Sequence, residues 1–315
     1  MRIVWFLFAL ACFCRISQAD EGETLTAERY RQSRVLARTK TIGVLQHWLD
    51  LREQAGWRIQ KDVRNDQFRL IDEFYRVETT GTREDCLARL AAINPQLPTS
   101  DADRETVILL HGLGRSSLGM EHFANSLEKN GYRVVCFNYP STLVDIDTAA
   151  QGLREVIATQ VSDNPIHVVA HSLGGLVSRA ALTDEPLDPR VKRLVMLGTP
   201  NHGAELADQL QNAPLIPEMV GPVGPQLLTG PDSYVTKLGV PKIEFGIIAG
   251  AMGTPFGISS RVPGDDDGTV SLKSALLDGA KDVMVIRMMH AFLIYDSTPL
   301  EATARFLKTG HFDES

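Results

Sequence analysis

From Glu105 onward, short runs of consecutive apolar residues alternate with amphipathic stretches. Six runs have the length of a buried β-strand, namely residues 106–110, 133–137, 166–170, 191–197, 245–249 and 283–286. Two of the intervening stretches, 149–160 and 173–182, carry apolar residues at helical spacing. Apolar strands that alternate with helices predict an α/β fold, in which a mainly parallel central sheet has helices on both faces.

The pattern before residue 101 is different and predicts a small N-terminal α+β lobe over 20–100. Val35, Ile42, Leu45 and Leu49 fall on one stripe, so we expect a single helix over about 24–54. Further expected elements are a hairpin from 57–59 and 68–70, a strand near 75–79, a helix over 82–93 and a linker over 94–99. No residue of this lobe indicates chemistry, and its partner is unknown.

The first 19 residues have the features of an export signal. Arg2 precedes an apolar run over 3–14, and small residues at 17–19 offer a cleavage point before Asp20. The run is shorter than the roughly 20 apolar residues that span a bilayer. We therefore expect a signal peptide over 1–19 and a periplasmic or secreted protein. A retained anchor, or a lipid attached to Cys12, is the alternative.

Composition narrows the classes of partner and cofactor. The chain is 43% hydrophobic and 23% charged, as soluble globular proteins are. A net charge of −7 argues against a nucleic-acid partner, which calls for a basic face. Beyond the signal only Cys86 and Cys136 remain, and no cysteine pair has metal-ligand spacing. We expect two buried thiols, with a disulfide as the alternative, and neither a cofactor nor a metal.

The candidate nucleophile is Ser172. The run over 166–170 leads into His171-Ser172-Leu173-Gly174-Gly175 and then a helix, and a serine at such a strand–turn–helix junction is a nucleophile elbow. Ala170 and Gly174, two residues to either side, are small enough to let strand and helix approach. The competing interpretation is that Ser172 only caps the helix.

The candidate oxyanion hole lies after the first strand of the α/β region. The run over 106–110 ends in His111-Gly112-Leu113-Gly114, whose glycines allow a tight turn close to a ligand. We expect the backbone N–H groups of Leu113 and Leu173 to hold the oxyanion, since losing one such donor costs about 100- to 1,000-fold in rate. The neighbouring His111, Gly112, His171 and Gly174 should line the pocket.

A serine nucleophile needs a base and an acid that follow it in the chain. His290 comes directly after the last predicted strand and is the expected base, whereas His202 should line the site from a loop and His311 lies near the terminus. The loop over 263–270 holds three consecutive aspartates. We favour Asp267 as the acid because Gly268 permits a tight turn, with Asp266 as the fallback; an acidic surface loop or a calcium site is the alternative.

These motifs carry a family resemblance. The stretches Ala170-His171-Ser172-Leu173-Gly174-Gly175-Leu176-Val177 and Leu197-Gly198-Thr199-Pro200-Asn201-His202-Gly203 resemble bacterial triacylglycerol lipases and related esterases, over roughly 105–310. The resemblance implies the α/β-hydrolase fold for a catalytic domain over 101–315, with a short cap around 204–243. It also implies a Ser172–His290–Asp267 triad with Leu113 and Leu173 as donors. Phe292 stands where many such lipases have a calcium-binding aspartate, so no calcium site is expected.

The expected activity is therefore cleavage of a small-molecule or lipid ester through an acyl-enzyme intermediate. Peripheral contact with a membrane is compatible with it. The alternatives are an acyltransferase or thioesterase that uses the same triad, and a non-catalytic binding protein on the same fold.

Overall fold

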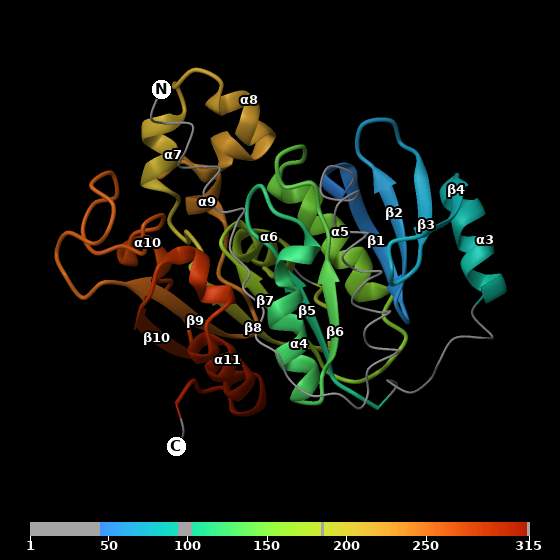
Figure 1. Ribbon diagram of the computed structural model, residues 1–315. Coiled ribbons are helices and arrows are strands. Elements are labelled where there is room, and N and C mark those ends of the chain that lie inside the picture. The colour runs from blue at the N-terminus through green and yellow to red at the C-terminus, as the bar shows by residue number, and fades with distance from the viewer. Residues whose placement is uncertain (1–44, 94–102, 184–185, 314–315) are drawn as a thin grey trace, which may run out of the picture. The chain divides into compact units, whose positions relative to one another are not determined.

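A six-stranded parallel sheet organises the computed structural model, which describes residues 45–93, 103–183 and 186–313 (Figure 1). Its strands are β5 (Thr106–Leu110), β6 (Arg133–Phe137), β7 (Ile166–His171), β8 (Val191–Leu197), β9 (Glu244–Ala251) and β10 (Asp282–Arg287). Their spatial order is β10-β9-β8-β7-β5-β6, which places β7 inside the sheet between β5 and β8. The six strands predicted from the apolar runs are confirmed.

Helices cover both faces of this sheet. On one face α5 (Ile146–Ala158) and α6 (Leu173–Leu182) share an apolar cluster with Val168 of β7. On the other face α4 (Glu121–Lys129) and α11 (Ser297–Thr309) share a cluster with Val169. Neighbouring residues of a strand point to opposite faces, so each central strand contributes to both clusters.

Short helical segments fill the connections at the carboxyl ends of the strands. Between β8 and β9 lie α7 (Glu205–Leu210), α8 (Ile216–Val220), the 3-10 helix Gly221–Leu227 and α9 (Tyr234–Lys237), in the segment expected to form the cap. A 3-10 helix, Ser117–Met120, follows β5. The segment α10 (Leu272–Ala275) precedes β10, and the 3-10 helix His290–Ile294 leads into α11. Among the described residues no helix is both long and apolar enough to cross a membrane.

The N-terminal part forms a separate antiparallel sheet. Its strands β1 (Trp48–Gln54), β2 (Trp57–Asp62), β3 (Phe68–Ile71) and β4 (Val77–Gly81) pair in chain order, after the 3-10 helix Leu45–His47. The helix α3 (Arg83–Ile93) packs on this sheet through Cys86 and Leu90. The predicted hairpin, strand and helix are confirmed, and no end differs from its predicted residue by more than three residues. The signal peptide (1–19) and the linker (94–99) lie outside the described residues.

The helix expected over about 24–54 is wrong in the part that the structure describes. Residues 24–44 of the expected helix are outside the described part, but Trp48–Gln54 is strand β1 rather than helix. Leu49 and Leu51 alternate along it and enter the core beneath α5, while Asp50 between them is also buried. A buried polar residue between two apolar ones hides the two-residue period, so the longer helical stripe dominated the pattern.

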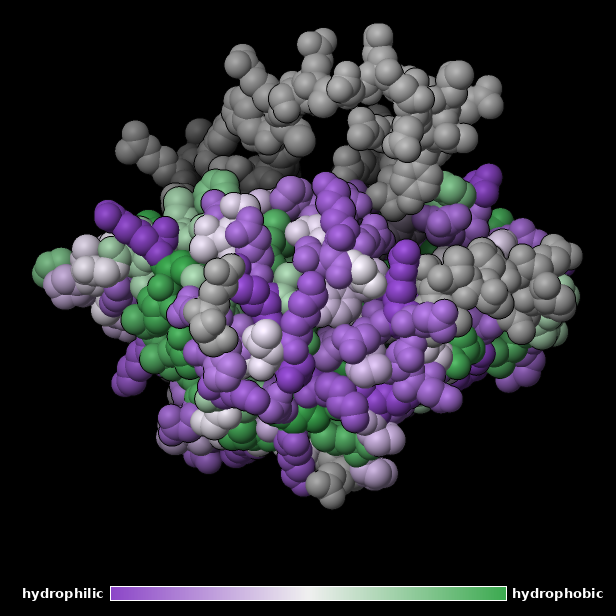
Figure 2. Space-filling model, turned by 90° about the horizontal axis from the view of Figure 1, so that it is seen from below, coloured by the Kyte–Doolittle hydropathy of each residue, from purple (hydrophilic) through white to green (hydrophobic). Residues whose placement is uncertain are grey.

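The two sheets belong to one compact unit, residues 40–315. Gly152 of α5 makes room for β1, since a Cβ there would lie 2.8 Å from Leu49 Cδ1. Cys86 is buried and Cys136 half-buried, and no disulfide joins them. Hydrophilic residues predominate on the face seen in Figure 2, and apolar residues form separate patches there.

Candidate active site

Ser172 lies at a strained turn between β7 and α6. Its φ is 57° and its ψ is −123°, a conformation that costs a non-glycine residue roughly 1–3 kcal/mol. Its N–H donates to the carbonyl of Leu197 at 2.9 Å, which holds the turn against β8. The Ser172 side chain makes no capping hydrogen bond to α6. The interpretation that this serine only caps the helix is therefore wrong.

Glycines after Ser172 let α6 pack directly on the sheet. A Cβ on Gly174 would lie 2.8 Å from the carbonyl oxygen of His111, and one on Gly175 would collide with the side chain of Thr199. A Cβ on Gly112 would lie 3.1 Å from Ser172 Cβ, so the loop after β5 runs beside the serine. The close approach expected at Gly112 and Gly174 is present, and Gly175 adds a second contact.

His290 and Asp267 form a hydrogen-bonded pair. His290 Nδ1 lies 2.7 Å from Asp267 Oδ2, and the His290 N–H donates to the Asp267 carbonyl at 2.8 Å. Asp267 Oδ1 accepts the N–H groups of Thr269 (3.0 Å) and Val270 (2.8 Å). Since the carboxylate accepts from Nδ1–H, the lone pair of His290 is left on Nε2. The Asp267 side chain is 1% exposed and that of His290 12%.

The three consecutive aspartates have different partners. Asp265 accepts the N–H groups of Met252 (2.7 Å) and Gly253 (2.8 Å). Asp266 accepts N–H groups within its own loop, those of Ile258, Ser259 and Gly268. Of the three, Asp267 is bonded to His290, which favours it over Asp266 as the acid.

The His290–Asp267 pair and the Ser172 turn converge at the carboxyl ends of their strands, where parallel sheets place their sites. The ring of His171, next to Ser172, lies 4.7 Å from that of His290, and its Nε2 lies 3.1 Å from the His290 carbonyl. Gly198 follows Leu197, and a Cβ there would lie 3.0 Å from His290 Nδ1. His290 is thus seated beside the residues that hold the serine.

Two glycines that the sequence argument did not single out make this arrangement possible. Gly198 has a φ of 56°, and its lack of a side chain leaves room for the His290 ring. A Cβ on Gly250 in β9 would lie 2.8 Å from Asp267 Cβ. A glycine inside an apolar strand often marks a close backbone approach. Gly250, which directly follows the apolar run over 245–249, was therefore the sequence signal for a close approach at this strand.

The candidate oxyanion donors have no other acceptor. In the described part of the chain, neither the Leu113 N–H nor the Leu173 N–H makes a hydrogen bond. The N–H of Gly114, by contrast, donates to Ser141 Oγ at 2.9 Å. Leu173 is the first residue of α6, and the N–H groups in the first turn of a helix have no partner within the helix. Both amides are therefore available to an anionic group near Ser172.

The histidines predicted to line the pocket lie in different environments. His111 is fully buried, stacks on Tyr139 at 4.2 Å, and has Nδ1 2.9 Å from the Gly112 carbonyl. His171 is buried against His290. His202 is exposed, and its ring makes no hydrogen bond to Ser172 or His290 among the residues described.

Burial of these histidines predicts acid sensitivity. Burial lowers the pKa of His111 to about 4 and that of His171 well below 6.5. Between pH 6.5 and 4, His111 is protonated in the unfolded chain but stays neutral in the folded protein. The free energy of unfolding should therefore fall as pH falls, by about 3 kcal/mol for His111 alone. Urea titrations at pH 7, 6, 5 and 4.5 measure this. His111→Asn should flatten the slope, and a flat wild-type profile would contradict the assignment.

Comparison with known proteins agrees with the fold. Residues 105–244 match the family model of the alpha/beta hydrolase fold. A 2-hydroxy-6-oxononadienedioate/2-hydroxy-6-oxononatrienedioate hydrolase of Escherichia coli O81 (strain ED1a) is 30% identical over 135 residues, which cover 36% of this chain and 46% of that protein. The chain thus spans about half the length of the curated relatives it matches.

Solved structures give the same result for the fold. The mature form of the lipase BlEst2 of Bacillus licheniformis has a TM-score of 0.53 at 23% identity, covering 66% of this chain and 92% of that one. Its propeptide form has a TM-score of 0.50 at 20% identity, covering 67% and 52%. The chain therefore has the α/β-hydrolase fold, with an antiparallel N-terminal sheet beside the parallel one, and it resembles the bacterial lipases and esterases of that fold.

Proposed function

We propose that this protein is a serine hydrolase that cleaves carboxylic esters of small molecules or lipids. The observation that carries the proposal is the Asp267–His290 pair, 2.7 Å between Oδ2 and Nδ1, beside the strained turn that presents Ser172. An ordinary loop needs neither a serine at positive φ nor a buried carboxylate bonded to a histidine. Together they supply a nucleophile, a base and an orienting acid.

The chemistry follows from the roles these atoms can take. His290 Nε2 accepts the proton of Ser172 Oγ as the oxygen attacks the ester carbonyl. The N–H groups of Leu113 and Leu173 stabilise the oxyanion, and His290 returns the proton to the leaving alcohol. Water then hydrolyses the acyl-enzyme by the same steps. Asp267 keeps Nδ1 protonated and stabilises the imidazolium that forms.

Exposed apolar side chains favour a substrate with an acyl chain. Leu215 is 71% exposed and Met219 54% in the segment between β8 and β9, and Phe292, two residues after His290, is 54% exposed. Apolar side chains of this size bind acyl chains, or the surface of a lipid aggregate, better than polar substrates. The proposal therefore covers both a carboxylesterase and a lipase.

Hydrolysis of p-nitrophenyl esters from acetate to palmitate tests the activity, and the preferred chain length separates the two classes. A fluorophosphonate, which reacts with activated serines, tests the site, since mass spectrometry should find the label on the peptide that contains Ser172. An acyl thioester run in parallel tests the thioesterase alternative. Absence of both turnover and label would overturn the proposal and favour a binding protein.

A further inference from the structure

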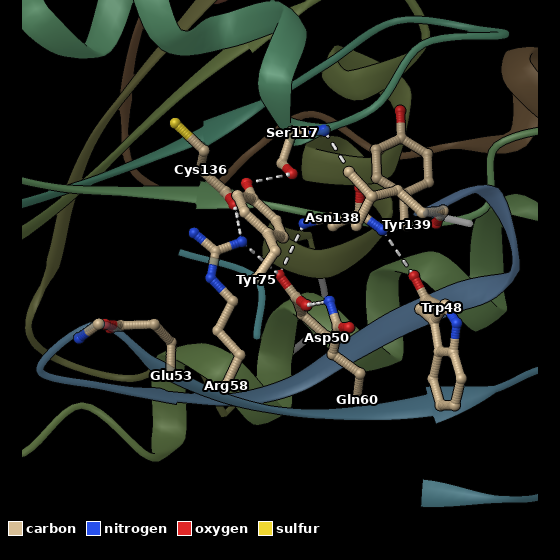
Figure 3. Close-up of polar contacts among 12 residues, drawn as sticks. Trp48, Asp50, Glu53, Arg58, Gln60, Tyr75, Ser117, Cys136, Asn138 and Tyr139 are labelled. Carbon is tan, nitrogen blue, oxygen red and sulfur yellow. Dashed lines mark hydrogen bonds and ion pairs between the residues drawn. The ribbon is translucent and has the colours of Figure 1, made fainter. Parts of the chain in front are cut away.

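The small sheet reaches the loop of Leu113 through buried polar contacts, most of them drawn in Figure 3. Asp50 on β1 is 1% exposed and pairs with Asn138, which directly follows β6. The Asp50 N–H donates to the Asn138 carbonyl at 2.9 Å, and the Asn138 N–H donates to Asp50 Oδ2 at 2.8 Å. This reciprocal pair ties one sheet to the edge of the other.

The Asp50 carboxylate has a full set of donors. Gln60 Nε2 donates to Oδ1 at 2.6 Å, and Arg58 Nη1 lies 3.3 Å from Oδ2 while it also donates to the Cys136 carbonyl at 2.8 Å. Burial raises the pKa of Asp50, and Arg58, Gln60 and the Asn138 N–H oppose that rise. Buried ion pairs contribute little net stability compared with apolar packing. Their stronger effect here is to fix geometry, since each group can bond in one arrangement.

Asn138 transmits this geometry to the loop. Its Oδ1 accepts the N–H of Ser117 at 3.1 Å, and its Nδ2 donates to the carbonyls of Leu45 (3.0 Å) and Trp48 (2.7 Å). Both ends of the side-chain amide are therefore used, one by the N-terminal part and the other by the segment after Leu113. Asn138 is fully buried, so water cannot replace these bonds at low cost.

The residues after Asn138 hold the loop on both sides of Leu113. The Tyr139 hydroxyl donates to the His111 carbonyl at 2.6 Å, and its ring stacks on that of His111. Ser141 Oγ accepts the Gly114 N–H at 2.9 Å. A direct contact from the small sheet's side, Tyr75 Oη to Ser117 Oγ at 3.2 Å, adds a further tie.

We infer that the N-terminal sheet is a positioning element: Asp50, acting through Asn138, holds the loop over 111–117 so that the Leu113 N–H faces the reacting carbonyl beside Ser172. The link to catalysis rests on the proposed function. The positioning itself rests on the contacts and can be measured without any turnover. A loop displaced by about 1 Å can cost on the order of 100-fold in rate, so a distant carboxylate can influence the chemistry.

Asp50→Asn tests the inference, with Asp62→Asn as the matched control. An amide has one acceptor oxygen, so at least one of the donors Arg58, Gln60 and Asn138 loses its partner. Asp62 lies in the neighbouring strand β2 and is equally buried, but among the described residues its carboxylate bonds only to Arg64, within its own turn. The two variants therefore make the same chemical change in the same sheet, and one of them is disconnected from the loop.

Amide hydrogen exchange of the peptide covering 111–118 is the first readout, with α11 as the internal reference. We expect Asp50→Asn to speed exchange in this peptide at least about tenfold, while α11 in the same protein and the loop of Asp62→Asn remain unchanged. Unchanged exchange in the loop would overturn the positioning role, whatever happens to activity. Equal acceleration in α11 would also overturn it, because the effect would then be general loss of stability.

Ester kinetics are the second readout. We expect Asp50→Asn to lower kcat about 10- to 100-fold with KM changed less than about twofold, because the loop acts on the transition state. Faster exchange without a fall in kcat would show that the position of the loop does not affect catalysis, which would overturn the link between the sheet and the reaction. A wild-type protein without turnover would overturn the proposed function. The exchange result would still test whether the N-terminal sheet positions the loop. Should Asp50→Asn fail to fold, Tyr75→Phe, which removes the hydroxyl that contacts Ser117 and keeps the ring, should raise exchange about threefold.

Discussion

Replacing Ser172 with alanine is expected to lower ester turnover by about 10⁴- to 10⁶-fold, the loss typical of a serine nucleophile. The residual rate would come from the backbone donors and from substrate binding. Initial rates on the preferred p-nitrophenyl ester measure the loss, and the fluorophosphonate label should disappear with it. A variant that keeps more than about a hundredth of the wild-type rate would exclude Ser172 as nucleophile.

Two control variants separate chemistry from folding. Ser178→Ala removes a buried hydroxyl from the same helix, where Ser178 Oγ donates to the Gly174 carbonyl at 2.9 Å, and should keep activity within about twofold. Ser172→Gly removes the hydroxyl and also relieves the strain of a φ of 57°. It should be inactive yet at least as stable as the wild type, so its loss of turnover cannot come from unfolding.

Asp267→Asn is expected to lower kcat about 10⁴-fold while leaving the protein folded. The amide can present its NH₂ group to His290 Nδ1, which favours the tautomer with the proton on Nε2 and removes the lone pair that Ser172 needs. The charge that stabilises the imidazolium is lost as well. The pH dependence of kcat/KM and the rate on the preferred ester measure the effect.

The adjacent aspartates are the controls for this variant. Asp266→Asn removes one of the two carboxylate oxygens that accept three loop N–H groups and should cost stability, about 1–3 kcal/mol, with little effect on kcat. Asp265→Asn should behave similarly through Met252 and Gly253. A larger fall in kcat at position 265 or 266 than at 267 would contradict the observed pairing with His290.

Strong local patterns made the central part of the fold predictable. Runs such as 106–110 and 166–170 are mostly apolar and buried at every position, because both faces of β5 and β7 are covered. A strand, a serine and small residues in sequence then fix the Ser172 turn, and the last strand leads to His290. These features are local, so a single sequence displays them.

Features that depend on distant contacts were not predictable. Asp50 falls within the helix expected over about 24–54, and nothing local marks its role because its partner Asn138 lies 88 residues away in the chain. The apparent lack of chemistry in the N-terminal lobe has the same origin, since Asp50 contacts the loop of Leu113 only through Asn138. Among three adjacent aspartates, the following Gly268 favoured Asp267, but the bond of Asp267 to His290 requires the tertiary structure. Gly198 and Gly250 are needed because His290 and Asp267 pack against them, and the sequence alone does not show these contacts.

The shared core of the two sheets has a consequence for how the protein can be divided. Leu49 and Leu51 of β1 pack in the same apolar cluster as side chains of α5 and β6. Removal of the antiparallel sheet would therefore expose apolar side chains of the parallel sheet and its helices. We therefore expect that the stretch over 105–244, which matches the family model, does not fold on its own. Residues 45–313 should melt in one cooperative transition, and a truncation that starts at the hydrolase motifs should aggregate rather than yield a minimal enzyme.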